Sequence, residues 1–70
     1  MKNLSIEQFV SGTLVEFKDG EIWKVEATNS CRFENVTMRP YNELAIENSG
    51  FSFWTFGLHY IKANAVTILF

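Results

Sequence analysis

The sequence predicts a mainly β protein, with a short N-terminal helix followed by a five-stranded, strongly bent small barrel. An Asp19-Gly20 pair, which tolerates the positive φ angles of a tight hairpin turn, joins two segments of alternating apolar and polar residues. Further segments rich in aromatic and β-branched residues follow, separated by turn residues. A chain of 70 residues is too short for a parallel α/β fold with its helical crossovers.

The length predicts a single domain over residues 1–70 that needs additional stabilisation. One core in so short a chain leaves about 3–5 kcal/mol of net stability. The lone cysteine, Cys31, excludes an intrachain disulfide, and a single histidine provides no cluster of ligands for a structural metal. We therefore expect a homo-oligomer without a metal or cofactor.

The charge pattern argues against long polyanions as partners. Eight acidic residues outnumber six basic ones, and the basic residues are scattered along the chain. No basic run is present that would follow double-stranded DNA. The N-terminal stretch lacks the apolar region of a signal peptide, and no run of 18 apolar residues predicts a membrane span. We expect a cytoplasmic protein in which Cys31 is reduced.

The expected helix covers residues 5–11. Ser5 and Gln8 have the spacing of a capping box, and Gly12 can end the helix. The apolar residues on one side of this helix are Leu4, Ile6, Phe9 and Val10.

The rest of the chain is expected to form strands joined by tight turns. "TLVEFK" and "EIWKVEAT" form the hairpin around Asp19-Gly20, and residues 33–39 form a third strand that Pro40 should bend. "ELAIENSGFSFW" is interpreted as a second hairpin with its turn at Asn48-Ser49-Gly50, and "AVTILF" is the final strand.

Asn35 is an unusual residue for the third strand, because its amide competes for backbone hydrogen bonds. Strand alternation places Phe33 and Asn35 on one face, and Val36 and Met38 on the other. An aromatic ring can stack on a base, and an amide can both donate to and accept from a base edge. The alternative is that Asn35 satisfies a turn and Phe33 belongs to the core.

The order of these features resembles the Sm and LSm family over roughly residues 5 to 69. "LVEFKDGEIWKVEATNSCRFENVTM" is similar to the first family motif, with Phe33 at the base-stacking aromatic and Asn35 at the motif asparagine. "YIKANAVTIL" is similar to the second motif, with Lys62 at the basic position. The chain departs from the pattern where the second-motif glycine is Ala63, although Asn64 could carry that turn. It also lacks the family's Asp after the second strand and has Val25 at a Gly position.

This resemblance implies a ring or other oligomer built by pairing edge strands, which removes exposed sheet edges. In "FSFWTF" the residues expected at that interface are Phe51, Phe53 and Phe56. The resemblance implies that each subunit holds a ligand with Phe33, Asn35, Lys62 and Asn64. Trp54 and Tyr60 are the candidate pocket walls.

The sequence has no nucleophile and base arrangement, Gly-rich phosphate loop or metal motif, so we expect a binding protein and not an enzyme. The favoured function is capture of a small nucleotide or cyclic nucleotide, as in the Sm-like phage sponges that sequester nucleotide immune signals. One alternative is an LSm-type ring that binds uridine-rich single-stranded RNA. A second is a protein-binding inhibitor or assembly subunit that uses exposed aromatic residues.

Overall fold

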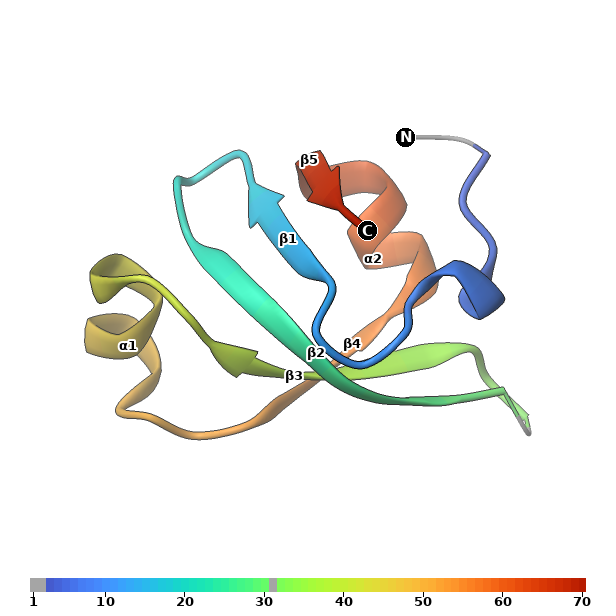
Figure 1. Ribbon diagram of the computed structural model, residues 1–70, viewed down its shortest axis with the longest axis horizontal. Coiled ribbons are helices and arrows are strands. Elements are labelled where there is room, and N and C mark those ends of the chain that lie inside the picture. The colour runs from blue at the N-terminus through green and yellow to red at the C-terminus, as the bar shows by residue number, and fades with distance from the viewer. Residues whose placement is uncertain (1–2, 31) are drawn as a thin grey trace.

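The structure is a computed structural model that describes residues 3–30 and 32–70, so the expectation for Cys31 lies outside the described residues. Figure 1 shows the arrangement of its elements. In chain order these are η1 (Ile6–Gln8), β1 (Leu14–Phe17), β2 (Ile22–Asn29), β3 (Asn35–Pro40), α1 (Glu43–Ser49), β4 (Trp54–Gly57), α2 (Leu58–Asn64) and β5 (Ala65–Leu69).

The five strands form one antiparallel sheet in the order β4-β3-β2-β1-β5. The prediction of a mainly β fold with five strands is thus confirmed. The sheet is not closed by pairing between β4 and β5, so these two strands are its edges and the predicted barrel is not confirmed. No helix in the described part of the chain has the length and apolar character needed to cross a membrane.

The N-terminal helix expected over residues 5–11 is reduced to a three-residue 3-10 turn, η1. The predicted capping box of Ser5 and Gln8 is present, and the Ser5 amide donates to Gln8 Oε1 at 2.8 Å. The chain leaves helical geometry at Phe9, with φ −88° and ψ 74°, and the Gly12 amide then donates to the Val25 carbonyl of β2 at 2.9 Å. Helices this short gain little stability by themselves.

The first hairpin is confirmed, with β1 and β2 antiparallel around the Asp19-Gly20 turn. Gly20 has a φ of 94°, and the Glu21 amide donates to Asp19 Oδ1 at 2.9 Å. The alternation of β2 breaks after Val25, where the register with β3 shifts and Ala27 becomes exposed. Ala27 is therefore outside the core, although strict alternation predicts it inside.

The second hairpin was predicted wrongly, since most of its first strand is the helix α1. The expected turn at Asn48-Ser49-Gly50 is the end of this helix, and Gly50 is its left-handed cap, with a φ of 65°. The Gly50 amide donates to the Ile46 carbonyl at 2.8 Å. A glycine after a helix and a glycine in a hairpin turn both supply a positive φ, which is why the two are confused.

Asn42 begins α1 and joins it to the first hairpin. Its Oδ1 accepts from the amides of Ala45 at 3.0 Å and Ile22 at 3.1 Å. Its Nδ2 donates to the Gly20 carbonyl at 2.9 Å. One side chain therefore caps the helix and holds it against the β1–β2 turn.

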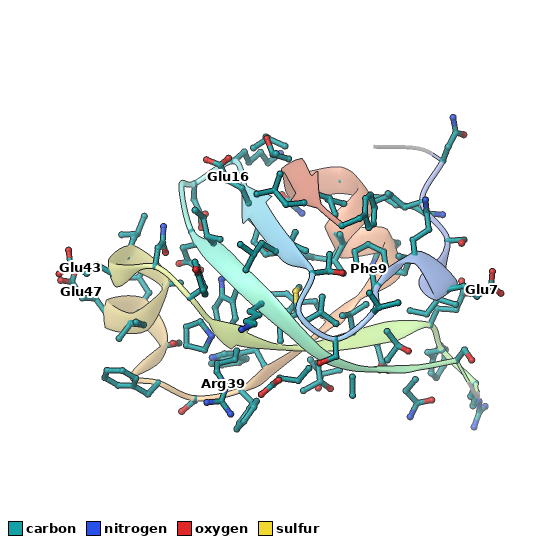
Figure 2. All side chains as sticks on the ribbon, viewed as in Figure 1. Glu7, Phe9, Glu16, Arg39, Glu43 and Glu47 are labelled. Atoms are coloured by element: carbon teal, nitrogen blue, oxygen red, sulfur yellow. The ribbon has the colours of Figure 1, made fainter. Side chains whose placement is uncertain are left out.

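The second helix, α2, was not predicted. It connects the edge strands β4 and β5 in the chain and contributes residues to the core. Leu58 and Ile61, one helical turn apart, are both buried. Phe9, which follows η1, is also buried and points into the interior (Figure 2). The remaining core residues are Ile6 of η1, Ala45 of α1, and, from the strands, Val15, Phe17, Trp23, Val25, Val36, Met38 and Ala65.

We predict that Asn42→Ala lowers the free energy of unfolding by about 1–3 kcal/mol, because it removes the helix cap and leaves part-buried backbone groups unpaired. Asn42→Asp keeps the acceptor oxygen and loses only the donor to Gly20, so its loss should be smaller. Urea denaturation of the wild type, Asn42→Asp and Asn42→Ala proteins measures the order of their stabilities. An Asn42→Ala protein within about 0.5 kcal/mol of wild type would contradict the role given to this side chain.

Candidate functional site

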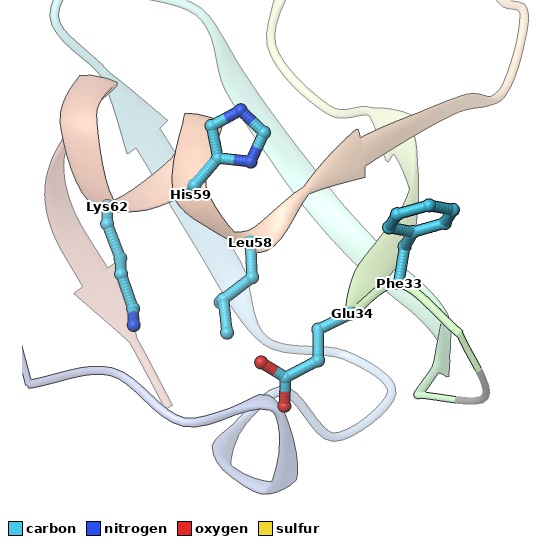
Figure 3. A pocket seen from close by; sticks show the side chains of 5 residues that line it. All are labelled: Phe33, Glu34, Leu58, His59 and Lys62. Carbon is cyan, nitrogen blue, oxygen red and sulfur yellow. The ribbon is translucent and has the colours of Figure 1, made fainter.

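A pocket of about 340 Å³ lies where the β2–β3 connection meets the start of α2. Figure 3 shows the five side chains that line it. They are Phe33, Glu34, Leu58, His59 and Lys62. Two segments that are far apart in the sequence thus form one site, with a carboxylate, an ammonium group, an imidazole and an exposed aromatic ring.

Backbone bonds join the two walls of this pocket. The Leu58 amide donates to the Glu34 carbonyl at 2.9 Å, and Asn35 of β3 pairs with Gly57 of β4. A Cβ on Gly57 would lie 3.3 Å from His59 Cε1 and Nδ1. The missing side chain of Gly57 therefore leaves room for the imidazole to fold back over the strand end.

Helical spacing brings Lys62 into the site. Leu58 and Lys62 are four residues apart in α2, so they lie on the same side of this helix as successive turns. Leu58 is buried in the core and holds this side of the helix in place. Lys62, one helical turn later, is half-buried. Figure 3 shows the rings of Phe33 and His59 on one side of Leu58, and the carboxylate of Glu34 and the ammonium group of Lys62 on the other.

Phe33 is on the surface and is not a core residue, with 71% of its area exposed. The carbon of the Arg32 guanidinium lies 5.7 Å from the ring centroid of Phe33. In β3 itself, Val36 and Met38 are fully buried, as the alternation predicts. An exposed ring beside a pocket with ionic groups can stack on a planar ligand.

The structure does not bring all the predicted ligand residues together. Asn35 is half-buried at the start of β3, next to Glu34, but it does not line the pocket. Asn64 is also outside it, and its Nδ2 donates to the Tyr60 carbonyl at 2.9 Å. The expected left-handed turn at Ala63 and Asn64 is absent, because both residues belong to α2.

The aromatic residues of the 51–56 segment lie in different surroundings. Phe51 and Phe53 are exposed, and the Arg39 guanidinium carbon lies 4.7 Å from the Phe53 ring centroid. Phe56 is half-buried and packs against the Phe17 ring at a centroid distance of 5.3 Å. Phe51 and Phe53 are thus available for an oligomer interface, whereas Phe56 is largely taken up by contacts within the chain.

The two candidate pocket walls also differ. Trp54 lines a second, smaller pocket near the end of α1. Tyr60 packs against Phe17 and Phe56, with ring centroids 5.8 and 5.7 Å apart, and lines neither of the two pockets described.

Three residues of the pocket, Glu34, Leu58 and His59, were missed as site residues. Glu34 follows the predicted Phe33 directly in the sequence. Leu58 and His59 precede Lys62 by four and three residues, which is the spacing of one helical face. Recognising "LHYIKAN" as a helix would have placed both of them beside Lys62.

The pocket is lined by ionic, aromatic and aliphatic side chains. Its five lining side chains include no Ser, Thr or Cys nucleophile. Over residues 3–30 and 32–70, no group of three or more His, Cys, Asp or Glu side chains could hold a metal ion. Comparisons with protein-family models, curated proteins and solved structures found no match.

We predict that Phe33→Ala changes the free energy of unfolding by no more than about 0.5 kcal/mol, because the ring is exposed. Leu58→Ala, made as the matched change on the buried side of the same pocket, should cost about 2–5 kcal/mol. Urea denaturation compares the two variants. A large loss in the free energy of unfolding for Phe33→Ala would indicate that this residue belongs to the core.

Proposed function

We propose that this protein is a non-enzymatic, homo-oligomeric binding protein that captures a small nucleotide or cyclic nucleotide in the pocket between Phe33 and Lys62. The observation that carries this proposal is that an exposed aromatic ring and an ammonium group, from segments far apart in the sequence, line one pocket. The Sm-like resemblance supports it, because that family pairs an aromatic residue with a basic one for the same purpose.

The two sides of the pocket match the two parts of a nucleotide. The base stacks on Phe33, on the side where the His59 ring also lies. The phosphate meets Lys62, and the sugar hydroxyls donate to the carboxylate of Glu34, as acidic side chains accept from ribose in dinucleotide sites. A volume of about 340 Å³ is near the lower limit of roughly 300–1,000 Å³ for small-molecule pockets, which fits one nucleotide.

The charges favour a small ligand over a long RNA. Glu34 and Lys62 give the pocket one acidic and one basic group, and the whole chain has a formal net charge of −2. A threaded RNA needs many phosphates neutralised, whereas one nucleotide needs only one or two positive groups. Binding of uridine-rich RNA remains the second candidate, supported by the same exposed Phe33.

The two open edges of the sheet support self-association. In the described part of the chain, β4 and β5 each have one neighbouring strand, so each has a free side. Free edges of this kind pair with other chains unless something covers them. Pairing of β4 with β5 of the next copy would extend the sheet from subunit to subunit and place Phe51 and Phe53 near the junction. In the alternative function, the exposed rings of Phe51 and Phe53 contact a different protein and not a second copy of this chain.

Isothermal titration with ribonucleoside monophosphates and cyclic nucleotides tests the ligand. We predict saturable binding that Phe33→Ala weakens roughly 5- to 150-fold, the equivalent of about 1–3 kcal/mol for a lost stacking contact. Lys62→Met should also weaken binding, and Tyr41→Ala, which removes an exposed aromatic ring elsewhere, should not. Binding of oligo-U alone, with a steep salt dependence, would favour RNA, and no binding of either would refute the proposal.

Native mass spectrometry tests the assembly, and we predict a mass of more than one subunit. Val66→Lys places a charge on the edge strand β5, where lysine opposes strand pairing, so it should shift the protein towards monomer. Val10→Lys changes another exposed valine, outside the sheet, and should leave the assembly intact. A monomeric wild-type protein would contradict this part of the proposal.

A further inference from the structure

A second pocket, of about 180 Å³, lies between the start of β2, the end of α1 and β4. It shares no lining residue with the nucleotide pocket. In Figure 1, α1 and the β1–β2 turn lie at one end of the long axis, and η1 lies at the other. The lining residues are Glu21, Trp23, Asn48, Ser49, Trp54 and Phe56.

The carboxylate of Glu21 is held in place by two neutral donors. Trp23 Nε1 donates to Oε1 at 2.7 Å, and Asn48 Nδ2 donates to Oε2 at 2.7 Å. Neither bond neutralises the negative charge, because an indole and an amide carry none. A half-buried carboxylate that is fixed in this way presents its charge to whatever enters the pocket.

Aromatic rings form the rest of the wall. The rings of Trp23 and Phe56 meet at a right-angled corner, with centroids 5.0 Å apart and an interplanar angle of 74°. Trp54 lies two residues before Phe56 in β4, so both side chains are on the same face of that strand. The face of an aromatic ring carries negative electrostatic potential and attracts cations, most strongly in tryptophan.

The surroundings are acidic and contain an unsatisfied polar group. Residues 40–61 contain Glu43 and Glu47 and no lysine or arginine. Figure 2 shows the Glu43 and Glu47 carboxylates at the outer end of α1. The hydroxyl oxygen of Ser49, a lining residue, is buried without a hydrogen-bond partner. A hydroxyl can accept a bond from an N–H donor of a ligand.

We propose that this second pocket binds an organic ammonium group, either the side chain of a lysine in a protein or a free alkylamine. The carboxylate of Glu21 and the aromatic corner both favour a cation. Its volume, well below that of the nucleotide pocket, suits a single head group. The two sites therefore select ligands of opposite charge.

The indole N–H signals of Trp23 and Trp54 in NMR spectra report on this pocket directly. Titration with n-butylammonium and choline should shift them saturably. The neutral compounds of matching shape, n-butanol and 3,3-dimethylbutanol, should bind about tenfold more weakly, since they lack the cation–π and carboxylate contacts. A blocked Gly-Lys-Gly peptide that binds more tightly than n-butylammonium indicates a protein lysine, and equal affinity indicates a free amine. Equal binding of charged and neutral compounds, or no shift with any of them, would overturn the proposal.

Two variants localise the effect. Glu21→Gln keeps the size of the side chain and removes its charge, so it should weaken cation binding about tenfold. Trp54→Ala, at a residue with 54% of its area exposed, should do the same without loss of folding, and it remains informative if Glu21→Gln unfolds. Glu7→Gln, at the opposite end of the molecule in Figure 2, is the matched control. Wild-type cation affinity in both pocket variants would contradict the assignment.

Discussion

The pocket lined by Phe33 and Lys62, where we propose that a nucleotide binds, depends on the bond from the Leu58 amide to the Glu34 carbonyl. Leu58 is buried in the core, so α2 begins at a fixed place beside the start of β3. From there, helical spacing alone decides that Lys62 reaches the same opening as Phe33. The hydrophobic core thus determines the positions of surface groups that it does not itself contain. A shift of one residue in the start of α2 would move Lys62 out of the pocket.

Strand β4 links the two pockets. Trp54 and Phe56 of this strand line the second pocket, which contains Glu21. Gly57, at the end of the strand, makes room for His59 in the pocket lined by Phe33 and Lys62. The two pockets also differ in charge. Residues 40–61, which contribute most of the second pocket, contain no lysine or arginine, and Lys62 of the first pocket is the next residue. If both proposals hold, a chain of 70 residues carries two separate binding pockets, one that accepts a phosphate at Lys62 and one that accepts a cation at Glu21.

The sequence predicted β1, β2, β3 and β5 well, but it missed the short helices and placed a second hairpin where α1 lies. The Asp19-Gly20 turn and the alternation around it are local signals, so β1 and β2 were found. The helices α1 and α2 have seven residues each, too short for a clear helical period, and Gly50 looks the same in a helix cap as in a hairpin turn. In the site, Phe33 and Lys62 were predicted from the family pattern. Glu34, Leu58 and His59 were not, because Leu58 and His59 belong to a helix that was not predicted, and Glu34 joins the site through the contact of its carbonyl with the start of that helix.

The central claim is that one nucleotide binds between the β2–β3 connection and α2, and mapping of backbone amide shifts by NMR tests it most directly. Titration of the protein with a ribonucleotide should perturb the amides of residues 33–35 and 57–62 and leave those of α1 unchanged. Shifts confined to residues 43–56, or no shifts at all, would contradict the claim.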